Sequence, residues 1–355
     1  MAMYEIADQD VLLDDRNPLG ENPADVIWEV THACALACRQ CRPGSTSRSN
    51  PSELNMREAE LFIDQVARAK PHVFTLTGGD PTYRRDLVHL IEYAWRRGLR
   101  VEMSPSATPR FLKADLKVFK DAGLQAISLG IDGATQAAQD AFRGVKGAWD
   151  WTMQACKAAR KAGVGLQINT TLTRKNFAQF DSLVALLEQI EPGSWNIFQI
   201  MPADHGKKDE MLTGEQMEEL FNRLVDLAPK VNFGIKTIEG QFYRRISLQR
   251  SSKGAQEPPA GTLNGGRGSV FVSHIGEICP SSFFPVAAGN VRSHELIDVY
   301  RSAPLFRNLR DPALLKGKCG RCEFKATCGG SRARAYLMSR DYLAEDALCI
   351  YQPRN

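Results

Sequence analysis

The sequence predicts an α/β fold built on a parallel sheet, and three observations support this prediction. Short apolar runs alternate with longer amphipathic segments from about residue 26 to residue 227. The connections between them are short, and two of the longer segments end at Gly123 and Gly163, as is typical of helix C-termini. Six strand–helix units in this order imply right-handed crossovers, in either an open doubly wound sheet or a partial barrel.

The predicted elements follow one another without large gaps. The strands cover 26–30, 73–76, 100–103, 125–129, 166–171 and 195–200. The helices cover 56–69, 87–95, 112–122, 149–162, 177–189 and 214–227. Asn55 with Glu58, and Thr213 with Gln216, have capping-box spacing and mark two helix starts. After these units we expect a linker over 230–265 and then a hairpin with strands at 269–273 and 278–280.

Composition excludes several classes of protein. The net charge of +4, from 45 basic and 41 acidic residues, is too small to favour nucleic acid or a membrane surface as the main partner. No apolar run approaches the roughly 18 residues of a membrane span, and residues 1–21 contain no signal-peptide core. The chain has nine cysteines, most of them in two groups near its ends, and this indicates metal ligation in a reducing, cytoplasmic environment rather than disulfides.

Three of these cysteines, Cys34, Cys38 and Cys41, follow the first predicted strand with C-x3-C-x2-C spacing. Disulfides between such near neighbours are geometrically unfavourable, so the spacing indicates a metal or cluster. Three thiolates on a four-iron cluster leave one iron open to a non-protein ligand. The alternatives are redox thiols or a zinc site, for which His32 is the only nearby fourth ligand.

The second predicted strand ends in Gly78-Gly79-Asp80-Pro81. Glycines lack a Cβ atom, so a ligand or another backbone can approach this turn closely. The alternative is an ordinary turn between a strand and a helix.

Four more cysteines lie near the C-terminus, at Cys319, Cys322, Cys328 and Cys349. Four thiolates are the full complement for a closed iron–sulfur cluster, and a zinc ribbon is the alternative. Cys156 falls inside an amphipathic helix and is expected to be a packed small side chain.

The first cysteine group, followed one strand later by the Gly-Gly-Asp-Pro turn, resembles the signature of radical SAM enzymes. This resemblance implies a partial (β/α)6 TIM-like barrel and a 4Fe–4S cluster whose open iron binds S-adenosylmethionine (SAM). The C-terminal cysteines resemble the auxiliary-cluster part of the SPASM/twitch extension, which implies a small C-terminal iron–sulfur domain. The sequence is most similar to a subgroup near mycofactocin maturases and radical SAM enzymes of heme biosynthesis.

The resemblance also implies cofactor contacts at the ends of the strands. The implied residues are Gly78, Gly79, Asp80, Ser104, Ser106, Asp132, Arg143 and Asn169. Asp80 replaces the family's usual glutamate but keeps an acceptor, and Gly130 stands where serine is usual. Ser331 stands where a complete SPASM extension has cysteine, so we expect a single auxiliary cluster, with Cys279 either a free thiol or a substrate-site residue.

The expected organisation is an N-terminal lead-in over 1–22, a radical SAM core over 23–230, and a linker with an auxiliary-cluster domain over 231–355. The implied activity is reductive cleavage of SAM to a 5′-deoxyadenosyl radical, followed by an oxidative modification such as decarboxylation. The electron donor would be a low-potential protein such as ferredoxin or flavodoxin.

The substrate that the resemblance favours is a tetrapyrrole. Arg292, Arg332 and Arg334 are candidate partners for its carboxylates. A ribosomally made peptide and a small metabolite are the other candidate substrates. A non-catalytic electron carrier is the alternative from another class, although a barrel with a Gly-Gly-Asp turn is unnecessary for that role.

Overall fold

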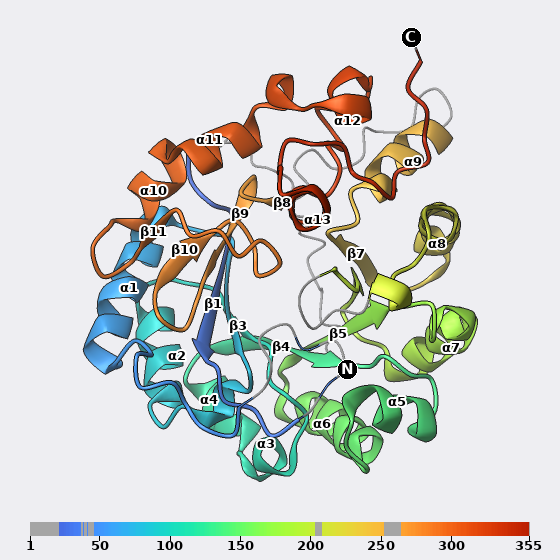
Figure 1. Cartoon of the computed structure of the whole chain (residues 1–355). Coiled ribbons are helices and arrows are strands. Elements are labelled where there is room, and N and C mark those ends of the chain that lie inside the picture. The colour runs from blue at the N-terminus through green and yellow to red at the C-terminus, as the bar shows by residue number, and fades with distance from the viewer. Residues whose placement is uncertain are drawn as a thin grey trace.

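A central barrel-shaped sheet surrounded by helices organises the protein (Figure 1). The computed structural model describes residues 21–36, 38, 41, 46–202, 208–251 and 264–354. The predicted lead-in over 1–22 lies almost entirely outside these residues. The strand order is β11-β10-β9-β1-β2-β3-β4-β5-β6-β7, with β8 paired to β9.

Seven strands run parallel in chain order. They are β1 (Asp25–Thr31), β2 (Val73–Gly78), β3 (Val101–Met103), β4 (Leu124–Gly130), β5 (Gly165–Leu172), β6 (Ser194–Gln199) and β7 (Gly234–Ile238). The helices outside them are α1 (Met56–Ala69), α2 (Leu87–Arg96), α3 (Pro109–Lys113), α4 (Leu116–Asp121), α5 (Gln136–Arg143), α6 (Ala148–Ala162), α7 (Phe180–Ile190), α8 (Gly214–Leu227) and α9 (Phe242–Arg250). The predicted partial barrel is therefore confirmed. Both predicted capping boxes also form.

The C-terminal segment extends the same sheet. Its strands are β8 (Asn264–Gly265), β9 (Gly268–Val272), β10 (Glu277–Cys279) and β11 (Gly289–Asn290). Its helices are α10 (Leu296–Ser302), α11 (Pro304–Arg310), α12 (Gly317–Arg321) and α13 (Arg332–Ser339). The predicted hairpin forms from β9 and β10, and β9 also pairs in parallel with β1. In Figure 1, α10, α11 and α12 occupy the arc between α1 and α9. The sheet thus crosses residue 230, and the division into two domains stays a prediction.

The structure of the barrel differs from the prediction at three places. Residues 234–250, expected within a linker, form β7 and α9. The helix expected over 112–122 is two helices, because Asp115 accepts a hydrogen bond from Lys117 N at 2.9 Å and starts a new helix at Leu116. Helix α5 was not expected at all, although Thr135 caps its start and Gly144 ends it with φ +70°.

The two faces of the sheet differ in polarity. Trp28 of β1 faces the helices, where its ring lies 5.4 Å from that of Phe62 in α1. Side chains alternate along a strand, so the neighbouring positions face the barrel interior. There Gln167 donates to Glu102 Oε2 at 2.8 Å, and Ser128 donates to Gln167 Oε1 at 3.0 Å. The interior is therefore lined in part by hydrogen-bonded polar side chains.

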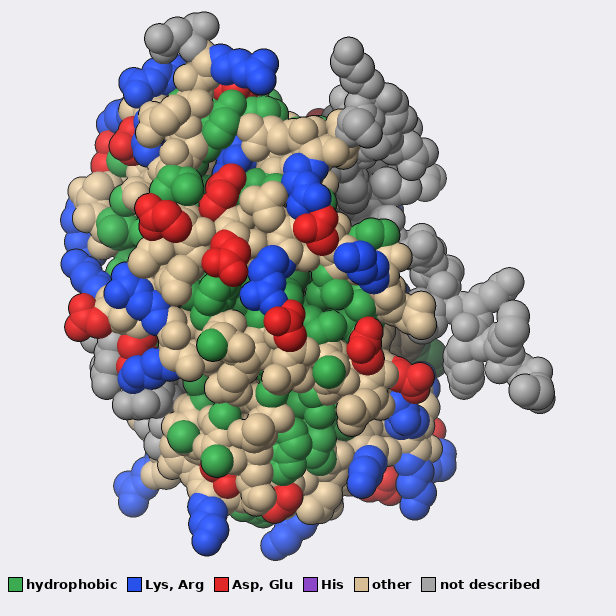
Figure 2. Space-filling view, turned by 90° about the vertical axis from the view of Figure 1, so that its right-hand side faces the viewer, with side chains coloured by type: hydrophobic (Ala, Val, Ile, Leu, Met, Phe, Trp, Pro, Cys, Tyr) green, Lys and Arg blue, Asp and Glu red, His purple; other side chains and the backbone are tan. Residues whose placement is uncertain are grey.

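The described helices include none long and apolar enough to cross a membrane. The face shown in Figure 2 carries basic and acidic side chains interspersed, with apolar side chains between them. No continuous basic surface covers the described residues of that face.

Asp25, at the start of β1, has a buried carboxyl group whose protonation makes the stability of the fold depend on pH. Burial raises the pKa of its carboxyl to about 7, Lys236 lowers the pKa in part, and Glu102 raises it. Because this value lies above the unfolded value of about 3.9, the folded state holds the proton more tightly. The stability gained from that proton is present at low pH and is lost as the pH rises from about 4 to about 7. Asp25→Asn should therefore raise the thermal unfolding midpoint more at about pH 8 than at about pH 5.

The measurement is circular dichroism during heating of the reconstituted protein at constant ionic strength. Asp298→Asn on the exposed side of α10 is the matched control and should change the midpoint equally at both pH values. An equal effect of Asp25→Asn at both pH values would contradict the prediction.

Candidate functional site

The first cysteine group lies in the loop that follows β1. Cys34 is buried, and its backbone N–H donates to Thr46 O at 2.8 Å. Cys41 N donates to Cys38 O at 3.1 Å, so the second and third cysteines lie in one turn. The other residues of 37–45, namely 37, 39, 40 and 42–45, lie outside the described part of the chain.

The Glu53 side chain forms hydrogen bonds with the chain at the start of this loop. Its Oε1 accepts hydrogen bonds from Thr31 Oγ1 at 2.8 Å, from His32 N at 2.9 Å and from Asn50 N at 3.0 Å. One carboxylate oxygen therefore joins the end of β1 to the chain that leads into α1.

His32, the fourth ligand that the zinc alternative requires, lies beside His274 of the β9–β10 turn. Their ring centroids are 4.8 Å apart, and the potential ligand atoms of Glu29, His32 and His274 lie within 4.8 Å of one another. His274 Nδ1 is 2.7 Å from Glu29 Oε2. This group joins β1 to the C-terminal hairpin.

The Gly-Gly-Asp turn lies directly on the cysteine loop. Gly79 N donates to Thr31 O at 2.9 Å, and Asp80 N donates to Ala33 O at 2.7 Å. A Cβ atom on residue 79 would lie 2.3 Å from Ala33 O. Glycine is therefore required for this contact between the two backbones.

The Asp80 side chain is completely buried and already has partners in the protein. Oδ1 accepts from Thr82 Oγ1 at 2.8 Å, and Oδ2 accepts from Thr108 Oγ1 at 3.1 Å. Burial raises the pKa of this carboxyl, and the hydrogen bonds from Thr82 and Thr108 lower it in part. The geometry therefore gives Asp80 a positioning role, while its predicted contact with SAM stays a prediction.

Ser106 bridges the cysteine loop and the glycine turn. Its hydroxyl donates to Gly79 O at 3.2 Å and lies 3.3 Å from Cys34 Sγ. Burial raises the pKa of the Cys34 thiol, and the contact with Ser106 lowers it in part. Ser104, at the end of β3, donates its backbone N–H to Leu76 O at 2.8 Å.

Asp132 and Arg143 form a buried ion pair after β4. Helix α5 returns Arg143 toward the strand end, where its Nη1 lies 3.9 Å from Cys38 Sγ. Asp132 Oδ1 also accepts from Thr171 N at 2.7 Å. The carboxylate that Arg143 pairs with is therefore one of the protein's own, and its predicted contact with SAM stays a prediction.

Gly130 lies against this pair. A Cβ atom on residue 130 would lie 1.7 Å from Arg143 Nη2, so the serine usual in the family would displace the guanidinium. Asn169 lies within β5, level with Gly130 at the end of β4, and accepts from Asn196 Nδ2 at 2.8 Å. The predicted cofactor residues thus gather at the carboxyl ends of β1 to β5, the end where barrel active sites lie.

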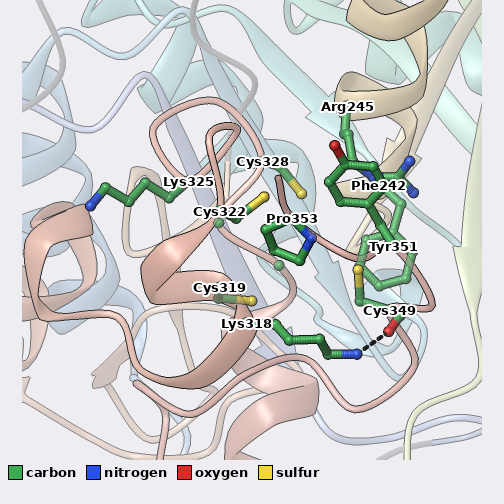
Figure 3. A pocket seen from close by; sticks show the side chains of 12 residues that line it. Phe242, Arg245, Lys318, Cys319, Cys322, Lys325, Cys328, Cys349, Tyr351 and Pro353 are labelled. Atoms are coloured by element: carbon green, nitrogen blue, oxygen red, sulfur yellow. Dashed lines mark hydrogen bonds between the residues drawn. The ribbon is translucent and has the colours of Figure 1, made fainter. Parts of the chain in front are cut away.

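The four C-terminal cysteines line one cavity, shown in Figure 3. It contains about 350 Å³ of empty space, part of it open to solvent. Arg245, Lys318 and Lys325 line the same cavity, and its lining includes no aspartate or glutamate among the described residues.

The donor sets of both cysteine groups fit iron–sulfur clusters. The first supplies three sulfurs, with a hydroxyl near Cys34 and a guanidinium near Cys38. In the second group, burial raises the pKa of the Cys328 thiol to about 12. A thiolate there needs positive charge beside it, which iron ligated by four cysteines would supply.

Ser331 and Cys279, the two residues that bear on whether a second auxiliary cluster forms, are not among the residues that line this cavity. Ser331 caps α13: its Oγ accepts from Arg334 N at 3.0 Å and donates to Glu239 Oε2 at 2.6 Å. Cys279 is buried at the end of β10, opposite Phe271 of β9.

Each of the three C-terminal arginines has partners in the protein, so their contact with substrate carboxylates stays a prediction. Arg334 forms a fully buried ion pair with Asp346, at 2.7 Å. Arg292 pairs with Glu58, also at 2.7 Å. Arg332 donates to Ala344 O at 2.7 Å from a position that is 3% exposed.

Known proteins resemble this chain over nearly its whole length. The model of the Radical SAM superfamily matches residues 28–187. AdoMet-dependent heme synthase from Oleidesulfovibrio alaskensis is 36% identical over 341 residues, which cover 93% of this chain and 87% of that protein. Mycofactocin maturase MftC from Mycobacterium tuberculosis is 29% identical over 344 residues, which cover 92% and 83%.

Among solved structures, SuiB of Streptococcus suis bound to the precursor peptide SuiA matches with a TM-score of 0.72. The match covers 93% of this chain and 76% of that chain at 15% identity, and it shows a shared fold. With the relative at 36% identity matched over most of its length, the chain belongs to the radical SAM superfamily of enzymes, and this membership implies a 4Fe–4S cluster and SAM.

Proposed function

We propose that this radical SAM enzyme oxidatively modifies a tetrapyrrole of the heme pathway, for example by decarboxylating a propionate side chain. The main support is a four-cysteine cavity in a chain that is 36% identical to a protein named AdoMet-dependent heme synthase. The proposal includes two 4Fe–4S clusters. Their ligands are Cys34, Cys38 and Cys41 for the first, and Cys319, Cys322, Cys328 and Cys349 for the auxiliary cluster.

When bound, the first cluster and SAM supply a 5′-deoxyadenosyl radical that removes a hydrogen atom from an unactivated C–H bond. The chain holds and orients these groups. In our proposal the glycine turn, Ser104 and Asn169 contact SAM. Asp80, Ser106 and the Asp132–Arg143 pair keep the cysteine loop in place.

The auxiliary cluster has a separate task in this proposal. Removing a hydrogen atom and CO2 from a propionate leaves one electron on the substrate, so the net oxidation needs an electron acceptor. A closed cluster in the C-terminal cavity can take up that electron. A low-potential donor such as ferredoxin or flavodoxin supplies the electron that cleaves SAM.

A ribosomally made peptide is the second candidate substrate, and the 29% identity to a mycofactocin maturase favours it. A small metabolite remains the third candidate.

The decisive assay is anaerobic. Reconstituted protein is reduced with dithionite and given SAM, and 5′-deoxyadenosine is measured by chromatography. Adding a coproporphyrin-type tetrapyrrole should increase 5′-deoxyadenosine and give a product that lacks a carboxyl group by mass spectrometry. Absence of 5′-deoxyadenosine under all conditions would contradict the proposed activity. Modification of a precursor peptide in place of the tetrapyrrole would favour the second candidate.

Cysteine variants separate the two clusters. Cys322→Ala should leave SAM cleavage within about twofold of the parent while lowering product about a hundredfold, because only the electron acceptor is lost. Cys34→Ala should abolish both. Cys156→Ala, at a buried cysteine inside α6, is the matched control and should change neither. Full product formation by Cys322→Ala would refute the role of the auxiliary cluster.

Gly130→Ala tests the buried ion pair. The added Cβ should push Arg143 away from Asp132, and separating a buried ion pair costs about 3–5 kcal/mol. We therefore expect the rate of SAM cleavage to fall by about tenfold or more, with loss of iron from the first cluster. Gly193→Ala is the control, because its nearest neighbour is 3.6 Å from the new Cβ. Equal rates and iron contents for the two variants would contradict this role.

A further inference from the structure

Arg332 has an unusual position for a buried cation. It is 3% exposed at the start of α13. Its Nη1 donates to Tyr342 O at 2.8 Å and to Ala344 O at 2.7 Å, and its Nη2 lies 3.7 Å from Cys319 Sγ. Its hydrogen bonds within the described part of the chain include no carboxylate.

Two other buried arginines nearby each have a carboxylate. Arg245 pairs with Glu218, and Arg334 pairs with Asp346. The carboxylates of Asp346 and Asp341 feel the charge of Arg332, but neither accepts a hydrogen bond from it: Asp346 accepts from Arg334, Ser331 N and Leu348 N, and Asp341 pairs with Lys316. A buried cation is costly unless an opposite charge offsets it. Arg332 donates hydrogen bonds to backbone carbonyl oxygens and to the sulfur of Cys319. Of these acceptors, the sulfur is the one that can carry a negative charge.

A second donor points at the same sulfur. The backbone N–H of Asp346 donates to Cys319 Sγ at 3.4 Å. Lys318 and Lys325 also line the cavity and add positive charge to its surroundings (Figure 3). The surroundings of Cys319 therefore favour negative charge on the sulfur and on anything bound to it.

We propose that Arg332 is a positioning residue that raises the reduction potential of the auxiliary cluster through its N–H···S contact with Cys319. Reduction adds one electron and one negative charge to the cluster, and no bond forms or breaks. Hydrogen bonds to ligand sulfurs and nearby cations stabilise that charge, so they make the cluster a better electron acceptor. In turnover the electron comes from the substrate-centred radical. This inference rests on the proposed auxiliary cluster.

The test isolates that cluster. A full-length parent carrying Cys34→Ala, Cys38→Ala and Cys41→Ala keeps only the cavity cysteines as its cluster site. After reconstitution, iron and sulfide are counted, and the midpoint potential is measured by titration with dithionite, followed by electron paramagnetic resonance. Arg332→Gln in this parent should raise the ratio of oxidised to reduced cluster at a fixed potential about tenfold. This corresponds to a midpoint potential lower by about 59 mV for a one-electron couple.

Arg340→Gln is the matched control, because Arg340 is exposed at the other end of α13 and loses the same charge. Its midpoint should equal that of the parent. An Arg332→Gln midpoint equal to the parent's, with full iron content, overturns the inference.

Arg332→Lys keeps the positive charge, and it decides the case in which Arg332→Gln loses its iron. A lowered midpoint for Arg332→Lys then supports the inference. An unchanged midpoint, or loss of iron from both variants, overturns it, since the role of Arg332 would then be structural. A parent that binds no iron contradicts the proposed auxiliary cluster itself, which is a different failure.

Discussion

Two backbone hydrogen bonds lay the end of β2 on the start of the cysteine loop, and the candidate active site depends on this contact. The contact requires that Thr31 of β1 lie beside Gly78 of β2, a register that the parallel pairing of the two strands provides. It also requires the absence of a side chain at residue 79, where a Cβ would lie 2.3 Å from Ala33 O. Ser106 can touch both Cys34 Sγ and Gly79 O because these two segments are already in contact. A larger residue in the turn would therefore disturb the cysteine loop and the carboxyl end of β2 together.

Much of this arrangement was predictable from local patterns, and the parts that were not depend on distant partners. The strand periodicity, the capping boxes and the spacing of the cysteines are local, and they led to the barrel and to both cysteine groups. The strand β7 was missed because Lys236 and Thr237 interrupt its apolar pattern. Helix α9 was missed because its buried Arg245 finds its carboxylate, Glu218, on α8. Arg143 was expected to contact the cofactor, and only the return of α5 toward β4 shows that it pairs with Asp132.

The C-terminal segment is joined to the barrel by polar contacts as well as by the sheet. Glu239, just after β7, accepts from Ser281 at 3.2 Å and from Ser331 at 2.6 Å. Ser331 in turn caps α13, the helix that carries Arg332 and Arg334. Gly329 and Gly330 both have positive φ, +64° and +66°, and turn the chain from Cys328 into this cap. The residue that replaces the family's cysteine thus serves to fix the cysteine cavity to the end of β7.

The two cysteine groups differ in how their neighbouring charges are balanced. Arg143 Nη1 lies 3.9 Å from Cys38 Sγ and Arg332 Nη2 lies 3.7 Å from Cys319 Sγ, so in each group a guanidinium contacts a cysteine sulfur. Arg143 is neutralised by Asp132, whose side chain is 1% exposed, whereas Arg332 contacts only carbonyl oxygens and the sulfur within the described residues. A neutral pair stabilises added negative charge less than an unpaired cation does. In the proposed reaction the first cluster gives up an electron and the auxiliary cluster accepts one. Asp132 forms an ion pair with Arg143 itself, whereas Asp346, the buried carboxylate near Arg332, forms its ion pair with Arg334. This difference in pairing favours electron flow in that direction.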